Sequence, residues 1–226
     1  MESGSPEQDT GGSKGEGLYS DNETLISTQL LKRSWRNEKA APQILQFQSS
    51  LVQTSRERIE EMEQIVDELV EKGEDPISVS LHQMDMDRTS FLLRSYLRTR
   101  LHKIQKFMFH IKDTPDLWDR LSKEEQAFAL GSIEAMKKHL EQSVLSKLPE
   151  RYGSHLQQSS ISEGNDMVPE PNLDAFVICR TRKFIGPLPV DDSGEENPLD
   201  MYAGDIYALR YKTIKPLIES GELDLV

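Results

Sequence analysis

RSYLRTRLHKIQK, residues 94–106, is strongly basic within a chain whose formal net charge is -12. It contains no acidic residue and five bases: Arg94, Arg98, Arg100, Lys103 and Lys106. It lies inside a longer segment, residues 77–111, in which large aliphatic side chains recur every three or four residues. Side chains at this spacing share one face of an α-helix. The segment therefore predicts a long helix with a continuous apolar stripe and with bases around the rest of its circumference.

Aromatic residues extend the apolar surface of this predicted helix beyond the stripe. Tyr96 and Phe107 flank one side of it, whereas Phe91 lies well away from it. Because the helix is apolar on more than one side, we expect it to contact several neighbours.

The residues on the N-terminal side predict a tail followed by two further helices. Residues 1–22 are mostly Gly, Ser and acidic residues with little to bury, so we expect a disordered tail. A helix of about 16 residues is predicted from Thr24 onward by aliphatic side chains and Trp35 near helical spacing. A second helix begins near Ser50 and is closed by Gly73 and Pro76. Its acidic face offers partners within the chain for the bases of the long helix, since residues 57–75 hold nine acids against two bases.

The residues on the C-terminal side complete a helical domain and predict a second, different one. Ser122 and Glu125 form a capping-box pattern at the start of a fourth helix that runs to about Lys147. Residues 149–171 are rich in polar residues, Gly and Pro without periodicity, which predicts a linker.

Beyond the linker, DAFVICRTRKFIGPLPV (174–190) has the β-branched and aromatic residues of strands. A further strand, a short helix with Thr213 as candidate N-cap, and the terminal strand LDLV (223–226) follow. The predicted fold is therefore mainly α with a small β-rich second domain: a helical bundle, the A domain, over residues 23–148, and a B domain over residues 172–226.

Composition and motifs argue against several classes of function. No run approaches the roughly 20 apolar residues of a membrane-spanning helix, and the N-terminus has acids where a signal peptide has bases, so we expect an intracellular protein without membrane contact. His82 and Asp85 would share a helix face, but a third metal ligand at matching spacing is missing. No nucleophile elbow, phosphate loop or paired-carboxylate site is present. We therefore expect no enzymatic activity and no cofactor.

The basic helix leaves two interpretations open. A basic face can follow the phosphates of nucleic acid, and Tyr96 could stack on a base, which makes a helical nucleic-acid-binding protein that uses residues 88–112 the alternative. The acidic total opposes such binding, and arginine is well suited to pairing with buried or interfacial carboxylates. A scaffold whose bases support packing is therefore favoured.

Three strings resemble a known family. SWRNEKAAPQIL (34–45), ISVSLHQMDMDRTSFLLRSYLRTRLHKIQKF (77–107) and LRYKTIKPLIESGELDLV (209–226) closely resemble GINS complex subunits of the Sld-five type, also called GINS subunit four. The resemblance implies a heterotetramer of four related subunits, each with a helical A domain and a β-rich B domain, here in that order. It further implies that GINS joins the MCM ring and a CDC-type RecJ-like protein in the nucleus to form the eukaryotic replicative DNA helicase.

The resemblance also suggests what individual parts of the chain do. ATP hydrolysis would belong to the MCM ring, and this chain would hold its partners, the three other GINS subunits among them, in position. The segment DNETLISTQLL (21–31) is a candidate for recruiting a replisome adaptor. If the linker is flexible, the B domain docks separately and its terminal residues supply apolar contact. The candidate subunit-interface or structural residues are Trp35, Phe91, Arg94, Tyr96, Arg98, Arg100, Lys103, Lys106, Phe107, Tyr211, Leu223, Leu225 and Val226.

Overall fold

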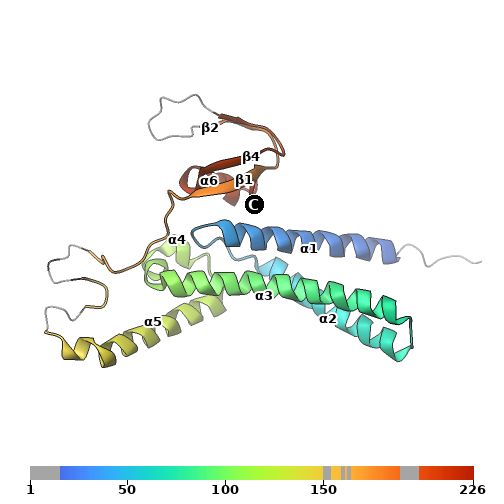
Figure 1. Ribbon diagram of the computed structural model, residues 1–226, viewed down its shortest axis with the longest axis horizontal. Coiled ribbons are helices and arrows are strands. Elements are labelled where there is room, and N and C mark those ends of the chain that lie inside the picture. Colours follow the sequence, from blue (N-terminus) through green and yellow to red (C-terminus); the bar gives the residue numbers. More distant parts are fainter. Residues whose placement is uncertain (1–15, 150–153, 159–160, 162–163, 189–198) are drawn as a thin grey trace, which may run out of the picture.

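The computed structural model describes residues 16–149, 154–158, 161, 164–188 and 199–226. Three long helices lie alongside one another, a fourth extends from one end of this group, and a small β domain sits over the C-terminal half of the first helix (Figure 1). The predicted fold class, a helical bundle followed by a small β-rich domain, is confirmed.

The helical domain is built from α1 (Glu16–Ala40), α2 (Ser49–Glu71), α3 (Pro76–Asp113) and α5 (Lys123–Ser143). A one-turn helix, α4 (Pro115–Trp118), separates α3 from α5, and a 3-10 turn, η1 (Leu145–Lys147), follows α5. Helix α1 begins earlier than the sequence indicates, because residues 16–22 of the predicted tail are helical. The rest of that predicted tail lies outside the described residues.

Glycine and proline set the sharp reversal between α2 and α3. Gly73 has a φ of 68°, and the N–H groups of Gly73 and Glu74 donate to the carbonyls of Val70 and Leu69 at 3.1 Å each. This pattern closes a helix and favours glycine, which has no Cβ to clash at positive φ. Asp75 then caps α3 by accepting from the Ile77 N–H at 3.3 Å. The predicted end of the second helix is confirmed.

The bundle packs around two apolar clusters that share α3. Near its middle, Leu92 and Leu93 of α3 pack with Leu31 of α1, and half-buried side chains such as Trp35 surround them. Toward its C-terminal end, Ile104, Phe107 and Ile111 pack against the α4 region and against Ala129 of α5. Because α3 contributes to both clusters, the other helices are arranged around it, as the several apolar faces of its sequence predict.

The β domain contains a three-stranded antiparallel sheet in the order β4-β1-β5, formed by β4 (Ile206–Arg210), β1 (Phe176–Thr181) and β5 (Leu223–Leu225). In β1 the side chains of Val177, Cys179 and Thr181 are buried and the alternate ones are exposed. Helix α6 (Tyr211–Glu219) covers the buried side of this sheet with Ile214 and Ile218. A separate hairpin of β2 (Ile185–Leu188) and β3 (Leu199–Met201) completes the domain.

Helix α6 starts two residues before the predicted N-cap, Thr213, so that prediction is wrong. The actual N-cap is Arg210, whose side chain makes no capping hydrogen bond. Instead, the N–H groups of Tyr211 and Lys212 donate to the carbonyls of Ala175 and Leu173 at 3.0 and 2.9 Å. The segment before β1 thus takes the place of a side-chain cap, a tertiary contact that local sequence does not reveal.

Two glycines provide a matched test of these backbone conformations. We expect Gly73→Ala to destabilise the protein by about 1 kcal/mol, because alanine is strained at positive φ. We expect Gly131→Ala, in the interior of α5 with open space around its Cβ position, to stabilise it by about 0.5–1 kcal/mol. Urea unfolding followed by circular dichroism checks both. Shifts of the same sign would show that backbone conformation does not decide these effects.

Candidate functional site

Arg100 lies at the centre of a buried charge network in the bundle. Its side chain is completely buried, and Glu125 of α5 binds it through two parallel contacts, Nε to Oε1 at 2.7 Å and Nη2 to Oε2 at 2.9 Å. Glu38 of α1 accepts from Nη1 at 2.9 Å, and the carbonyls of Leu45 and Arg120 accept at 2.7 and 3.2 Å. All five guanidinium N–H donors are therefore satisfied. Burial alone would lower the pKa of Arg100, but Glu125 and Glu38 raise it above its ordinary value.

Lys103 completes the network one turn further along α3. Its Nζ donates to Glu38 Oε1 at 2.8 Å, to the Gln43 carbonyl at 3.0 Å, and to the Glu38 carbonyl. Burial lowers the pKa of Lys103, and the carboxylate of Glu38 opposes that shift. Glu38 thus binds two cations, Arg100 and Lys103. The charge network consists of these three residues and Glu125, and it contains two cations and two carboxylates. It joins α1, α3, α5 and the loop after α1.

Glu125 has a second task at the start of α5. Its side chain accepts from the Ser122 N–H at 3.0 Å, while its own N–H donates to Ser122 Oγ at 3.2 Å. The predicted capping box is therefore confirmed. What the sequence did not indicate is that the same carboxylate also binds Arg100, so that the cap of α5 and the charge network share one group.

The acidic face of α2 does not supply the partners of these bases, contrary to one sequence expectation. Two of its carboxylates pair within the helix instead, Glu61 with Arg58 at 3.1 Å and Glu68 with Lys72 at 3.0 Å. The acids that bind Arg100 and Lys103 come from α1 and α5. Their positions, 62 and 25 residues from Arg100, have no periodic signature. A single glutamate in SWRNEKAAPQIL and one in a capping box were the only signals available.

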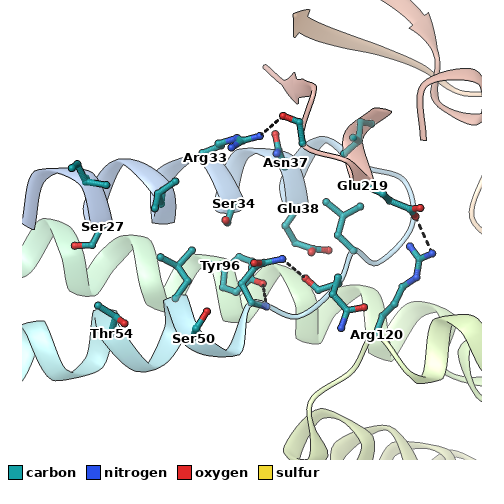
Figure 2. Close-up of a pocket in the computed structure, with 18 of the residues that line it drawn as sticks. Ser27, Arg33, Ser34, Asn37, Glu38, Ser50, Thr54, Tyr96, Arg120 and Glu219 are labelled. Carbon is teal, nitrogen blue, oxygen red and sulfur yellow. Dashed lines mark hydrogen bonds and ion pairs between the residues drawn. The ribbon is translucent and has the colours of Figure 1, made fainter. Parts of the chain in front are cut away.

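The β domain is joined to α1 through its C-terminal strand. Arg33 forms an ion pair with Asp224 and donates from Nη2 to the Gly221 carbonyl at 3.2 Å. One turn further along, Asn37 accepts from the Leu225 N–H at 2.8 Å. Figure 2 shows Arg33 and Asn37 on the side of α1 that faces the β domain. These contacts hold the domain against the bundle.

A second set of polar contacts joins the β domain to the region between α4 and α5. Arg120 pairs with Glu219 of α6 at 2.9 Å and with Asp116 at 2.8 Å. The amide oxygen of Gln43, in the orientation that satisfies its neighbours, accepts from Lys215 Nζ at 3.2 Å and from Arg120 Nη1 at 3.3 Å. The domains are therefore fixed from two sides, and an open groove of about 790 Å³ lies between α1, the start of α2 and α6 (Figure 2).

The predicted site residues fall into three environments. Arg94, Arg98, Lys106, Phe91 and Val226 are exposed, and Lys106 lies over the Phe107 ring at 5.0 Å. Trp35 and Lys103 are partly buried. The remaining residues are buried: Tyr96, Arg100, Phe107, Tyr211, Leu223 and Leu225. Leu223 and Leu225 pack into the core of their own β domain together with Ala41 from the bundle, so they do not form the outer contact expected of a separately docking domain.

The exposed apolar residues of α3 gather on one face near its N-terminal end. Ile77, Leu81, Met84 and Phe91 are spaced by four, three and seven residues, which places them along one side of the helix. Between 59% and 69% of each side chain is exposed, values high for such large groups. We call these four residues the α3 stripe. The described part of the chain leaves these four apolar side chains uncovered, and the exposed Arg88 lies between Met84 and Phe91 on the same side of the helix.

Two features are absent from the described residues. These residues contain no group of three or more histidine, cysteine or acidic side chains that could hold a metal ion. Separately, no helix in the described part of the chain is both long and apolar enough to cross a membrane.

Comparisons with known proteins give a consistent result over both domains. A family model described as the GINS complex protein helical bundle domain matches residues 57–144, and one described as the DNA replication complex GINS protein SLD5 C-terminus matches residues 171–226. DNA replication complex GINS protein SLD5 of Arabidopsis thaliana is 50% identical over 93% of this chain and 97% of its own length. The human protein of that name is 34% identical over 87% of each chain, and that of Dictyostelium discoideum is 27% identical over 95% and 99%.

The chain is thus a two-domain protein of the mainly α class. It has a helical bundle organised around a buried charge network, a small antiparallel β domain fixed to that bundle, and exposed apolar side chains along one side of its longest helix. The chain belongs to the SLD5 family of DNA replication complex GINS proteins.

Two arginines on α3 test the charge network. We expect Arg100→Met to destabilise the full chain by about 3–5 kcal/mol, because it leaves the carboxylates of Glu38 and Glu125 buried without their main partner. Arg98→Met is the matched control, and since Arg98 is exposed it should change stability by less than about 0.5 kcal/mol. Denaturant unfolding measures both, and equal effects would show that the network is not what stabilises the bundle.

A pH test addresses Tyr96, which lies beside Arg100. Burial is the largest influence on its hydroxyl and raises the pKa of Tyr96 from 10.0 to about 12. A group whose pKa is raised by folding contributes stability below its unfolded value and loses it as the pH rises through the folded one. Stability should therefore fall between about pH 10 and pH 12, and Tyr96→Phe should make this fall smaller. Unfolding midpoints of the unaltered protein and of Tyr96→Phe, measured across this pH range, test the prediction. Equal losses of stability in the two proteins would show that Tyr96 does not cause the fall.

Proposed function

We propose that the chain is a non-catalytic scaffold subunit of the GINS heterotetramer. In this proposal it assembles with the three other GINS subunits in the nucleus, and the complex joins the MCM ring and a CDC-type RecJ-like protein to form the eukaryotic replicative DNA helicase. It acts in both initiation and elongation of DNA replication. The names of the relatives described above, DNA replication complex GINS protein SLD5, support the assembly and the process.

The α3 stripe is the observation that carries the proposal. Ile77, Leu81, Met84 and Phe91 form one apolar face, and apolar surface gains about 25 cal/mol per Å² when it leaves water. Large apolar side chains that are exposed along one helix face are typical of subunit interfaces, where a partner removes them from water. In this proposal, the other GINS subunits bind the α3 stripe and remove it from water.

The charge network supports the same function from inside the bundle. Because Arg100 and Lys103 bind groups from α1 and α5, the long helix α3 is held in one position relative to its neighbours. A helix held in this way presents its apolar stripe as a fixed surface, which reduces the entropy lost when a partner binds. The network's buried cations have carboxylate partners within the chain, which supports a structural role for them.

The alternative function, nucleic-acid binding by the basic helix at 88–112, is supported by three of the five bases in residues 94–106. Arg94, Arg98 and Lys106 are exposed, and none of them has a carboxylate partner within the described part of the chain. Arg100 and Lys103 cannot reach phosphates because they are engaged inside the bundle. A net charge of -12 adds long-range repulsion. The scaffold function is therefore the better supported of the two.

The segment proposed to bind an adaptor, residues 21–31, has both buried and exposed aliphatic side chains. Leu31 is completely buried in the bundle core, so it has no surface to offer. Ile26 and Leu30 are exposed and line the groove between α1 and α2. Among the described side chains of this segment, Ile26 and Leu30 are the ones that offer an adaptor exposed apolar contact.

Two methionines of nearly equal exposure, Met84 in the α3 stripe and Met167 in the linker, give a matched test of the scaffold function. When the chain is co-expressed with the three other GINS subunits, we expect Met84→Asp to reduce recovery of the heterotetramer at least about tenfold, since it places a charge in an apolar interface. Met167→Asp should leave recovery unchanged. Size-exclusion chromatography with mass determination measures it, and full assembly of Met84→Asp would exclude the α3 stripe as a subunit interface.

The nucleic-acid alternative has its own test on the same preparation. If this alternative is correct, charge reversal at Arg98 and Lys106 should leave assembly intact, and loss of assembly by these changes would count against it. A salt-sensitive affinity for duplex DNA that the reversal abolishes would establish the alternative. Equal DNA binding by the unaltered and the charge-reversed assemblies, or no binding by either, would exclude the nucleic-acid alternative.

A further inference from the structure

We propose that the outer edge of β4 (Ile206–Arg210) binds an extended acidic segment of another protein, which joins the sheet of the β domain as a fourth strand. This edge is remote from the α3 stripe, and its binding does not depend on the scaffold function.

The register of the sheet fixes which amides of β4 are free. The Tyr211 N–H donates to the Ala175 carbonyl at 3.0 Å, and the Thr181 N–H donates to the Asp205 carbonyl at 3.2 Å. Between these two bonds, antiparallel pairing repeats every second residue, so Tyr207 and Leu209 bond to β1. The N–H groups of Ile206, Ala208 and Arg210, and the carbonyls of Ile206 and Ala208, therefore point away from the sheet.

The opposite edge of the same sheet is covered, and β4 is not. Asn37 of α1 accepts from the outward N–H of Leu225 in β5, so that edge is occupied by the bundle. Among the described elements β4 packs mainly against β1 and α6, and no described strand pairs with its outer edge. Natural edge strands usually avoid association through proline, lysine or a bulge. The strand IYALR has no proline or lysine, and its pairing with β1 is regular.

The exposed side of the sheet next to this edge is apolar. Phe176 and Ile178 of β1 and Ile206 of β4 are each more than half exposed, and they lie on the face away from the α6 core. Ala208 lies directly across from Ile178. Its small side chain leaves space between Ile206 and Arg210, which suits a bulky apolar side chain from an added strand.

Exposed arginine side chains beside this edge further restrict the sequence of the strand that can bind there. Arg210 lies across from Phe176, with its guanidinium 5.8 Å from the ring centroid, and Arg180 lies across from Ile206. Both arginines are exposed, and among the described residues neither has a carboxylate partner. A carboxylate opposite Arg210 would gain a charge-assisted hydrogen bond. The fitting strand thus has an acidic residue followed, at every second position, by two apolar residues that lie next to Ala208 and Ile206.

The test uses the full chain, in the assembly with which it co-purifies, and a fluorescent seven-residue peptide. In the peptide, one glutamate and two valines occupy alternate positions separated by threonine. A control peptide has lysine in place of the glutamate. We expect the acidic peptide to bind, and hydrogen exchange to show that the amides of Ile206, Ala208 and Arg210 become protected. If these amides are already protected before the peptide is added, a sister subunit occupies the edge and the proposal is overturned.

Two variants distinguish strand addition from nonspecific binding of the peptide. Ala208→Pro removes an outward N–H without losing a bond to β1, so the sheet should form and peptide affinity should fall at least about tenfold. Arg210→Glu should weaken the acidic peptide and make the lysine peptide the preferred one. Thermal unfolding confirms that each variant is folded. No binding of the acidic peptide to the unaltered protein, or unchanged binding by folded Ala208→Pro, would overturn the proposal.

Discussion

The structure depends on one arginine that has no contact with water. Arg100 is completely buried, and each of its five N–H donors has an acceptor from α1, α5 or the segments beside them. A buried charge is tolerated only when its partners are in place, so the positions of Glu38 and Glu125 must be correct before the bundle can close. The network therefore restricts the ways in which three helices can pack.

Specificity is the main physical consequence of this arrangement, more than stability. Apolar side chains such as Leu92 and Ile104 would allow α3 to slide or rotate against its neighbours at little cost, because hydrophobic contact has no direction. Hydrogen bonds to a planar guanidinium do have direction. Lys103 adds a second fixed point one turn away. The α3 stripe is presented at a defined angle as a result.

Sequence patterns predicted what depends on neighbouring residues, and missed what depends on distant ones. The helices, the Gly73 turn, the Ser122 capping box and the terminal strand all follow from local spacing and were found. The partners of Arg100 were not, because no local feature of Glu38 or Glu125 indicates that either binds Arg100, and the acids of α2 were the expected partners. The start of α6 was misplaced for the same reason, since its first N–H groups bond to the segment before β1.

The contact between α1 and β5 has a consequence for folding during synthesis on the ribosome. Arg33 binds Asp224 across 191 residues of chain, and Asn37 binds Leu225 across 188. A ribosome adds about 5–20 residues per second, so α1 waits roughly 10 to 40 s for this partner to be synthesised. Even then, the residues of β5 must leave the exit tunnel before the sheet can close against the helix. Until Asp224 and Leu225 have been synthesised, the face of α1 that carries Arg33 and Asn37 has no β domain against it.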